Sequence, residues 1–516
     1  MPATVLSELR SPAADPGEGV LGDVLSRAAR EGPGDLLLSS PGTGETWTAA
    51  QLLAAARAVA AGLLRDRPPG ARIATCLGNG PAPVLLQLGV ALAGMTLVPV
   101  NPRARPAEVE HALRLSGAAC AFAAEEVAGN PVADLCAAVP GVDVVRVGDD
   151  WSAALPSATP GELPVVDPES LAQVQFTSGT TGRAKGVRIT HRAMVVTGHA
   201  FAGRLGPVAG RTWCNPMPLF HTAGNVLGVV GALWARAEHV VLPFAPGPVL
   251  QALADRRVTL LSAAPTLLDL LAEQGPGELP DLRVLFTGGM TVTPAFVDRV
   301  ERVFGARLSI TFGMTETCGA VLQTAPTDPD PVRRGTVGAP LAGTEVRIAG
   351  PDGDVVPRGT PGELWARGAR ITRGYLDDPA ATAAAIDAHG WLHTGDLAVM
   401  EPGGACRVVG RLKDMIKTGG ENVSPGEVEE VLVEHPGVAR AAVVGVPDER
   451  WGELVVAFVV PAGGPGPSPL ELTEHCRERL SPFKVPRSWR VVDDLPMTAS
   501  AKVQRAELRR IAAGAP

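Results

Sequence analysis

Residues 173–190 read QVQFTSGTTGRAKGVRIT, and the ten residues 177–186 give this stretch its chemical character. A strand-like segment, Gln173 to Phe176, comes first, and Thr190 is placed to cap a following helix. Between them, glycine and small hydroxyl residues leave backbone N–H groups free to surround an anion, and Lys185 adds a mobile positive charge. The spacing G-x-x-G-x-x-K-G is not that of a Walker A loop. The stretch predicts a polyphosphate-binding loop, with a plain turn as the alternative if it is taken alone.

Apolar segments with strand and helix character alternate through the first three hundred residues. The order strand, helix, strand occurs in Arg72–Leu77, Ala82–Ala93 and Thr96–Val100, and again in Leu282–Phe286, Pro294–Phe304 and Arg307–Phe312. Such alternation predicts parallel sheets joined by crossover helices.

The second half of the chain has a different pattern of apolar and polar residues. Short alternating runs between Gly335 and Arg373 predict an antiparallel sheet or a small barrel. Beyond Gly410, the sequence Ser-Pro-Gly-Glu at 424–427 predicts a helix that starts with a capping box. We therefore expect an α/β fold: a large N-terminal domain, residues 1–411, of stacked βαβ sheets plus a small β-barrel, then a small α+β C-terminal domain, residues 412–516.

Composition limits the classes of function. The chain has 516 residues, a formal net charge of −8 and 46% hydrophobic residues, so more than one domain is expected and a nucleic-acid partner is not. Its start resembles no secretory signal, and its most apolar run, Val84–Val100, is interrupted by polar and helix-breaking residues. Seven cysteines without C-x-x-C spacing predict neither a disulfide framework nor a zinc site. We expect a cytoplasmic protein without an integral membrane segment.

Only five of the 46 basic residues are lysines, namely Lys185, Lys413, Lys417, Lys484 and Lys502. Where arginine is so strongly favoured, a lysine can mark a place that needs a compact, flexible ammonium group. Chance is the alternative, and the surroundings of each lysine decide between the two.

Seven motifs, in order and over nearly the whole chain, resemble those of the adenylate-forming enzymes. This family includes acyl-CoA synthetases, peptide-synthetase adenylation domains and firefly luciferase. Beyond 177–186, the matching segments are PLFH at 218–221, FGMTET at 312–317, GEL at 362–364, GWLHTGD at 390–396, GRLKD at 410–414 and PMTASAK at 496–502. Four of the five lysines lie in or beside these motifs, which favours a functional reason for their presence.

The resemblance implies a two-step ligation that uses ATP, Mg²⁺ and coenzyme A. A carboxylate attacks the α-phosphate of Mg-ATP to give acyl-AMP and pyrophosphate, and a thiol then displaces AMP. The implied partner is a small-molecule carboxylic acid, and a homodimer is compatible with the family. Which acid is activated does not follow from the sequence.

The resemblance also implies roles for residues of an ATP site. The β- and γ-phosphates would be held by Thr177, Ser178, Gly179, Thr180, Thr181, Gly182 and Lys185. Glu316 would bind Mg²⁺, a hard cation that prefers oxygen ligands, and Thr315 would bond the α-phosphate. Asp396 would accept from both ribose hydroxyls, and Arg411 would help to hold the nucleotide. The adenine segment would comprise Gly288, Gly289, Met290, Thr311, Phe312 and Gly313, with Phe312 standing where the family commonly has tyrosine.

Three further residues are implied in catalysis. Lys502 would bridge the acyl carboxylate and the α-phosphate during adenylation, and Lys413 would be the hinge between the two domains. His221 would border the carboxylate pocket and the thiol tunnel, although a lone histidine is also often a core residue. The segments 222–225 and 310–311 would line the acyl pocket.

The acceptor thiol is expected to be free coenzyme A. Gly419, Gly420 and Glu421 belong to a G-G-E-N-V stretch that resembles acyl-CoA synthetases, and no carrier-protein sequence follows Lys502. Lys484 either meets a phosphate of coenzyme A or is an ordinary surface lysine. A close rival is an adenylating enzyme that passes its acyl group to a carrier protein or amine, or that activates a non-carboxylate acid. A more distant rival is an inactive homologue that only binds ligands.

Two positions depart from the family pattern. Ala184 stands where proline is common, which predicts a somewhat looser phosphate loop. Ala501 stands where the family has glycine before the catalytic lysine. If that position needs a positive φ, alanine strains the loop that carries Lys502.

Overall fold

The computed structural model describes residues 5–12, 17, 19–159, 161–177, 184–206, 210–290, 292–464, 466–497 and 503–514. The chain divides into two compact units. The larger unit comprises Leu9–Val346 and Ala366–His393, and the smaller unit comprises Met1–Glu8, Arg347–Trp365 and Thr394–Pro516. The domain boundary expected between residues 411 and 412 stays a prediction.

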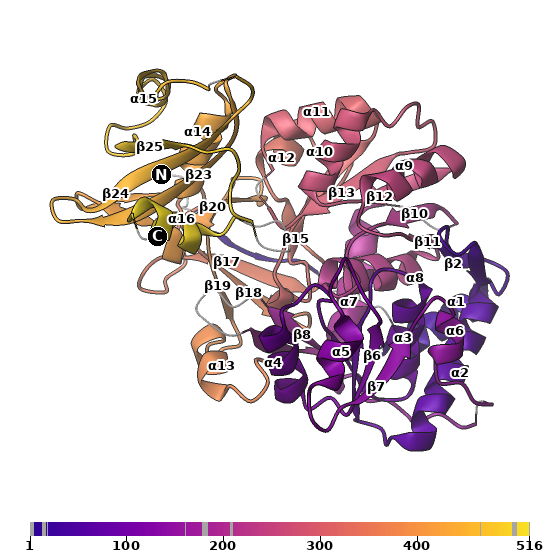
Figure 1. The fold of residues 1–516 in the computed structure, drawn as a ribbon. Coiled ribbons are helices and arrows are strands. Elements are labelled where there is room, and N and C mark those ends of the chain that lie inside the picture. Colours follow the sequence, from indigo (N-terminus) through magenta and orange to yellow (C-terminus); the bar gives the residue numbers. More distant parts are fainter. Residues whose placement is uncertain are drawn as a thin grey trace. The chain divides into compact units, whose positions relative to one another are not determined.

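Two sheets of mainly parallel strands form the larger unit (Figure 1). The nine-stranded sheet has the order β16-β15-β14-β13-β12-β10-β11-β2-β3. Its strands are β2 (Leu36–Ser40), β3 (Glu45–Thr48), β10 (Thr212–Asn215), β11 (Glu238–Val241), β12 (Val258–Ser262), β13 (Val284–Gly288), β14 (Arg307–Phe312), β15 (Leu322–Gln323) and β16 (Ala339–Pro340). The six-stranded sheet has the order β7-β6-β4-β5-β8-β9. Its strands are β4 (Arg72–Cys76), β5 (Thr96–Pro99), β6 (Cys120–Ala124), β7 (Asp143–Val147), β8 (Leu171–Thr177) and β9 (Lys185–Thr190).

Helices cover both faces of each sheet, as the strand–helix alternation predicts. The helices packed between the sheets include α1 (Leu21–Glu31), α2 (Ala49–Asp66), α3 (Pro81–Leu92), α7 (His191–Arg204) and α8 (Gly231–Ala235). The outer faces carry α4 (Pro106–Ser116) and α5 (Val132–Ala137) on the smaller sheet, and α9 (Pro246–Asp255), α10 (Pro265–Gln274), α11 (Pro294–Phe304) and α12 (Asp330–Gly335) on the larger. Two further short helices are α6 (Trp151–Ala154) and α13 (Pro379–Ala385).

Successive residues of one strand serve different cores, because side chains alternate across a sheet. Ile73 packs into the central core between the sheets, whereas Ala74 packs outward against the cluster that contains α4 and α5. In the larger sheet, Phe286 faces the central core and Leu285 faces the outer helices. Strands buried on both faces must be apolar throughout, and this explains why the sequence shows continuous apolar runs here.

The predicted helices and strands agree with the structure, except that one strand begins later than predicted. The structure also decides between an antiparallel sheet and a small barrel. The helix at 294–304 and the strand at 307–312 are confirmed, whereas the strand predicted at 282–286 begins two residues later, at Val284. Leu282 is buried, but it packs against the outer helices before the strand begins. A five-stranded sheet of order β1-β17-β18-β19-β20 occurs where a sheet or small barrel was expected. It is an open sheet, and no closed barrel is found within the described ranges.

The strands of this sheet are β1 (Glu8–Arg10), β17 (Thr344–Ala349), β18 (Gly362–Gly368), β19 (Leu392–Met400) and β20 (Cys406–Arg411). A second sheet lies in the smaller unit, with the order β22-β21-β24-β23 and with β25 paired to β24. It contains β21 (Ile416–Thr418), β22 (Glu421–Val423), β23 (Val438–Asp448), β24 (Gly452–Pro461) and β25 (Ser488–Val491). The helices α14 (Pro425–Val433) and α15 (Pro469–Arg477) pack on one face, and α16 (Arg505–Ala512) packs on the other.

The predicted capping box at the start of α14 was wrong. Ser424 is the N-cap residue, but its hydroxyl donates to the carbonyl oxygen of Val409 and not to the first turn of the helix. Glu427, the expected partner in the box, accepts from Lys484 at 2.6 Å. Both side chains therefore bond to partners outside the helix, which a local pattern cannot reveal.

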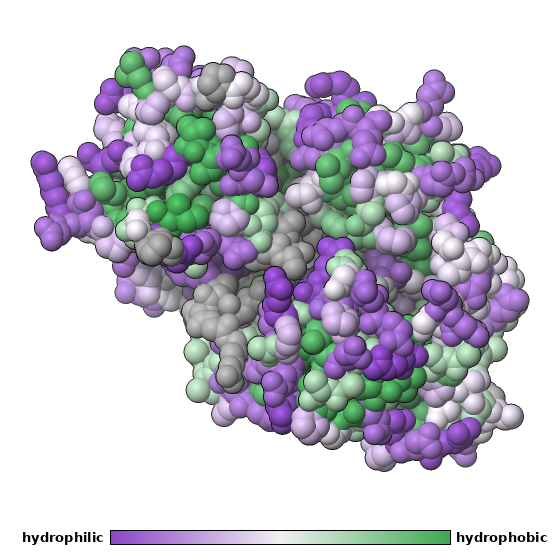
Figure 2. All heavy atoms as spheres, viewed as in Figure 1, coloured by the Kyte–Doolittle hydropathy of each residue, from purple (hydrophilic) through white to green (hydrophobic). Residues whose placement is uncertain are grey.

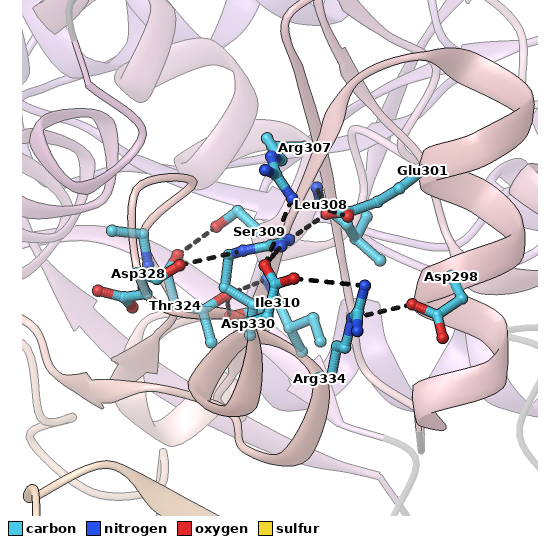
Figure 3. A network of polar contacts seen from close by, with 12 residues as sticks. Asp298, Glu301, Arg307, Leu308, Ser309, Ile310, Thr324, Asp328, Asp330 and Arg334 are labelled. Atoms are coloured by element: carbon cyan, nitrogen blue, oxygen red, sulfur yellow. Dashed lines mark hydrogen bonds and ion pairs between the residues drawn. The ribbon is translucent and has the colours of Figure 1, made fainter.

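A network of polar contacts fixes the start of β14 (Figure 3). The Leu308 N–H donates to Glu301 Oε1 at 2.9 Å, and the Ile310 N–H donates to Thr324 Oγ1 at 2.8 Å. The fully buried Arg333 pairs with Glu301 and Asp330. Since buried charges are tolerated only when they are paired, this cluster holds the strand in one register.

Apart from the neighbours Val5 and Leu6, the exposed large apolar side chains of the described surface are separated along the chain. Phe244, for example, lies in the connection between β11 and α9, and Leu270 lies in α10. On the face drawn in Figure 2, apolar residues are interspersed with hydrophilic ones. Exposed apolar residues that are scattered in this way are ordinary and indicate no docking face.

Two buried histidines should make the protein sensitive to acid. Burial lowers the pKa of His191 and of His239 from 6.5 to about 4. Between these values the unfolded chain binds protons that the folded chain excludes, so stability is complete above pH 6.5 and falls as the pH drops towards 4. Each histidine should cost about 2 kcal/mol of unfolding free energy at pH 5 relative to neutral pH.

Urea unfolding at pH 7.5 and pH 5.0 tests this expectation. The His191→Phe variant should lose about 2 kcal/mol less than the wild type between the two pH values. The exposed His389, changed to phenylalanine, is the matched control and should behave like the wild type. Equal losses in the wild type and the His191→Phe variant would contradict the assignment.

Candidate active site

The predicted phosphate loop connects two paired strands. β8 and β9 are antiparallel, and Thr177 lies directly opposite Lys185. Ser178, Gly179, Thr180, Thr181 and Gly182 lie outside the described residues. At the end of the loop, the Ala184 carbonyl oxygen is 2.7 Å from Nε2 of His111. The strand register thus brings both ends of the predicted loop together.

Glu316 lies in a short 3₁₀ turn, Thr315–Thr317, that follows β14. Its side chain is buried, with 6% of the residue exposed, and its Oε1 accepts from the Tyr375 hydroxyl at 2.8 Å. Its own carbonyl oxygen accepts from the Thr372 N–H at 2.8 Å. The ammonium nitrogen of Lys185 is 4.7 Å from the centroid of the Tyr375 ring. Tyr375 therefore connects the predicted metal ligand with the predicted phosphate lysine.

The predicted adenine segment lies where two parallel strands end side by side. Gly288 at the end of β13 pairs with Thr311 near the end of β14. A Cβ atom at Gly288 would lie 2.5 Å from the Thr311 carbonyl oxygen, and Gly289 has a φ of +82°. A Cβ atom at Gly313 would lie 2.4 Å from the carbonyl oxygen of Gly319. Glycine is therefore required here to let backbone segments approach closely.

Met290 and Phe312 complete this set, and both belong to the described residues. Phe312 is partly buried at the last position of β14. The structure thus brings Gly288, Gly289 and Met290 beside Thr311, Phe312 and Gly313, because their strands are neighbours. An open crevice at the carboxyl ends of parallel strands is the usual position of a ligand in such sheets.

The loop that carries His221 is held by one asparagine. The Nδ2 of Asn79 donates to the carbonyl oxygens of Pro216, Met217 and Leu242 at 2.9–3.0 Å. Its Oδ1 accepts from the Leu219 N–H at 2.9 Å. His221 is partly buried, and its ring lies 4.6 Å from that of Phe220.

Buried amides lie beneath the same loop. Asn225 donates to the carbonyl oxygen of Leu219 at 2.9 Å, and Gln175 donates to that of Phe220 at 2.7 Å. A π-helix, η1 (Ala223–Val230), begins two residues after His221. π-helical turns are rare and often occur at functional sites. A Cβ atom at Gly319 would lie 3.1 Å from Thr222, so this loop adjoins the turn that contains Glu316.

In the smaller unit, Asp396 and Arg411 face each other across β19 and β20. Arg411 donates to both carboxylate oxygens of Asp396, at 2.7 and 3.4 Å. The Asp396 side chain is only 5% exposed, and its backbone N–H donates to the Thr394 hydroxyl at 3.1 Å. The preceding Gly395 has a φ of +71° and donates to Glu363. The motifs at 362–364, 390–396 and 410–414 therefore meet.

The predicted hinge residue lies in a short 3₁₀ turn, Leu412–Asp414, between β20 and β21. Burial lowers the pKa of Lys413, and its neighbour Asp414 accepts from Arg509 at 3.0 Å. Arg505 pairs with Glu429 through two hydrogen bonds of 2.9 and 3.0 Å. These pairs attach the turn and α14 to α16, the helix that follows the predicted catalytic lysine.

Lys502 itself lies outside the described residues, as does Ala501. The chain on either side is described, and Met497 and Val503 form an antiparallel bridge. The two residues that flank the segment 498–502 are therefore paired with each other. The strain that Ala501 would impose on this loop, if its φ must be positive, stays a prediction.

The predicted coenzyme A loop is a two-residue hairpin. Thr418 pairs with Glu421, and the intervening Gly419 and Gly420 have φ angles of +60° and +85°. A type I′ turn needs positive φ at both central positions, so the turn itself explains why both residues are glycine. Glu421 is exposed. Lys484 is paired with Glu427, which makes the surface-lysine alternative the simpler account of it.

The described residues suit a magnesium ion that is held mostly by phosphate. No group of three or more His, Cys, Asp or Glu side chains with metal-binding geometry occurs among them. Mg²⁺ usually binds one or two carboxylates together with substrate phosphates and water. A single buried carboxylate at Glu316 fits that requirement.

Sequence reasoning missed two residues that organise the site, Tyr375 and Asn79. Nothing in its local sequence distinguishes Asn79, although it clamps a loop more than a hundred residues away. For Tyr375 a signal existed, because it is the sole tyrosine of the chain. The rarity of tyrosine in this chain is a signal of the same kind as the rarity of lysine.

Comparisons with known proteins agree with the motifs. The model of the AMP-binding enzyme family matches residues 25–376, and that of the AMP-binding enzyme C-terminal domain matches residues 427–502. A feruloyl-CoA synthase from an Amycolatopsis species is 36% identical over 455 residues, covering 86% of this chain and 89% of the relative. A long-chain-fatty-acid–CoA ligase from Escherichia coli O6:H1 is 33% identical over 521 residues, covering 91% of each chain.

The fold of this chain also matches that of a solved structure. The o-succinylbenzoate coenzyme A synthetase from Bacillus subtilis, in complex with ATP and magnesium ion, matches with a TM-score of 0.84 and 28% identity. The match covers 94% of this chain and 99% of that one. Within the described parts of the chain, no helix combines the length and apolar character needed to cross a bilayer. From its motifs, its fold and these relatives, the chain belongs to the family of AMP-binding enzymes.

Proposed function

We propose that this chain is an AMP-forming carboxylate:CoA ligase. The observation that supports it best is the contact of Lys185, Tyr375 and Glu316 at the end of the phosphate-loop sequence. A cation and a buried carboxylate so arranged suit a substrate that carries both phosphate and magnesium. The relatives named feruloyl-CoA synthase and long-chain-fatty-acid–CoA ligase support the same reaction class.

In the first step, a carboxylate oxygen of the acid attacks the α-phosphorus of ATP. The bond to the β-phosphate oxygen breaks, pyrophosphate leaves, and acyl-AMP remains. The backbone and hydroxyls of Thr177–Gly182 and the ammonium of Lys185 would hold the leaving phosphates, while Thr315 would bond the α-phosphate. Mg²⁺ bound to Glu316 and to phosphate oxygens would neutralise charge on the triphosphate. Lys502 would offset the repulsion between the two reacting anions.

By the resemblance, the residues that would hold the nucleoside are those of the adenine segment and the pair Asp396 and Arg411. Phe312 offers its ring for stacking on adenine, and the glycine segments leave room for a flat base. Asp396 is oriented by Arg411 and would accept from the ribose hydroxyls, for which an acceptor-only carboxylate is suited.

In the second step, the thiol sulfur of coenzyme A attacks the acyl carbonyl carbon. The bond to AMP breaks, and the thioester forms. His221 would border the acyl group, and the hairpin at Gly419–Glu421 would contact coenzyme A. Because ATP and coenzyme A are intracellular cosubstrates, we place the activity in the cytoplasm.

The experiment that tests this function incubates the protein with Mg-ATP and panels of aromatic, short-chain and long-chain acids. We expect ATP–pyrophosphate exchange with the correct acid, and equal amounts of AMP and acyl thioester once coenzyme A is added. Exchange without thioester would instead support transfer to a carrier protein or an amine. Absence of exchange with every acid would support an inactive homologue.

Removal of Lys502 should impair adenylation alone. A preorganised cation that stabilises developing charge is worth on the order of 10²–10³ in rate, so Lys502→Ala should lose acyl-AMP formation by that factor. Thioester formation from supplied acyl-AMP should persist, since its leaving group is already activated. The two half-reactions are measured separately, with the exposed Arg490 changed to alanine as control. A loss of adenylation below about tenfold would contradict the role of a bridging cation.

A hinge at Lys413 makes a second prediction about the half-reactions. Proline fixes φ near −65°, so Lys413→Pro should impair one half-reaction more than the other by preventing a change of backbone angle. Lys413→Ala keeps that freedom and is the matched control. An equal loss in both half-reactions of a folded Lys413→Pro variant would argue against the hinge.

A further inference from the structure

Tyr375 is the only tyrosine among 516 residues, whereas phenylalanine occurs eleven times. Its hydroxyl donates to Glu316 at 2.8 Å, and its ring lies under the ammonium of Lys185 at 4.7 Å. A phenylalanine would offer the same ring to the lysine. Only the phenolic hydroxyl reaches the carboxylate, so the contact with Glu316 explains why this one aromatic residue is a tyrosine.

The backbone holds Tyr375 in place through the strand that begins with Lys185. The Leu376 N–H donates to the Gly186 carbonyl oxygen at 2.7 Å, and the Arg188 N–H donates to that of Gly374 at 3.0 Å. Tyr375 also forms an antiparallel bridge with Val187. β9 is the last strand of its sheet, so residues 374–376 extend that sheet at its edge. A shift of Tyr375 relative to Lys185 would break this pairing.

A second anchor lies on the other side of the tyrosine. Its N–H donates to the Thr382 hydroxyl at 2.9 Å. Gly374 has a φ of +92°, and a Cβ atom there would lie 2.3 Å from the Thr382 side chain. The preceding Thr372 donates from its N–H to the carbonyl oxygen of Glu316. The segment is thus tied both to β9 and to the turn that carries Glu316.

The chemistry of the phenol suits a fixed donor. A tyrosine hydroxyl ordinarily keeps its proton at physiological pH, and the geometry here makes it the donor to the Glu316 carboxylate. A hydroxyl that donates to a carboxylate forms a strong, directional hydrogen bond. The face of the same ring attracts an ammonium group. One side chain can therefore orient an anion and a cation at once.

We propose that Tyr375 is a positioning residue that holds the Glu316 carboxylate and the Lys185 ammonium in the arrangement that Mg-ATP requires. The proposal rests on the proposed function of this site in adenylation. The phenol donates to Oε1 of the carboxylate and so fixes the orientation in which Glu316 would meet Mg²⁺. Tyr375 does not contact a reacting atom in this account; it acts through its two neighbours.

Two substitutions separate the hydroxyl from the ring. Tyr375→Phe removes only the donor, so Glu316 must be ordered when magnesium binds. We therefore expect the magnesium concentration for half-maximal exchange to rise about tenfold, on the scale of one hydrogen bond to a charged group. The KM for the acid should stay unchanged. Tyr375→Leu also removes the ring, and should raise the KM for ATP in addition.

A double-mutant cycle tests whether the hydroxyl acts through Glu316. In a Glu316→Gln background, Tyr375→Phe should change the magnesium dependence by less than twofold, since coupled residues are not additive. Additive effects of the two substitutions would overturn the proposal. Circular dichroism and the thermal midpoint verify that each variant is folded.

The single tyrosine also provides a readout that does not depend on turnover. Biosynthetic labelling with 3-fluorotyrosine gives one ¹⁹F resonance, and it belongs to Tyr375. We expect this resonance to shift when Mg-ATP is added to the wild type, and the shift to fall by at least half in Glu316→Gln. An unmoved resonance in a protein that carries out exchange, together with normal magnesium dependence of Tyr375→Phe, would overturn the proposal and leave the proposed function intact. A clear ¹⁹F shift without exchange for any acid would support the positioning role and count against the proposed reaction.

Discussion

The antiparallel pairing of β8 with β9 is the constraint on which the candidate site of the larger unit depends. It places Thr177 opposite Lys185 and so joins the two ends of the phosphate-loop sequence. The outer edge of β9 pairs in turn with residues 374–376, and these carry the tyrosine that reaches Glu316. A single strand register thus sets the lysine, the tyrosine and the carboxylate. A slip by one residue would point Lys185 to the opposite face of the sheet.

The two carboxylates implied in ligand binding are buried, and each accepts a hydrogen bond from a neighbouring side chain. Glu316 accepts from Tyr375, and Asp396 accepts from Arg411. A buried carboxylate is costly unless it is hydrogen-bonded, so these neighbours lower the cost of keeping an anion ready for a ligand. The two pairings differ in kind. Arg411 brings a positive charge to Asp396, whereas the phenol that donates to Glu316 is neutral.

Much of the fold could be predicted from the pattern of apolar residues, since strands buried on both faces appear in the sequence as continuous apolar runs. The motifs indicated the site because their residue types and order are specific over nearly the whole chain. Local patterns failed where distant groups compete: Ser424 donates to Val409 instead of capping its helix. Asn79 and Tyr375 were missed because their partners are far away in the sequence. No spacing rule connects Glu316 with a residue 59 positions later, whereas the sheet does.

The central claim is that the acid reacts with the α-phosphate of ATP, and the fate of an oxygen atom tests it most directly. An acid labelled with ¹⁸O in its carboxylate is converted with Mg-ATP and coenzyme A, and the products are examined by mass spectrometry. One ¹⁸O atom is expected in AMP for each thioester formed, and none in pyrophosphate. Label in inorganic phosphate, with ADP as the nucleotide product, would show attack at the γ-phosphate and contradict it.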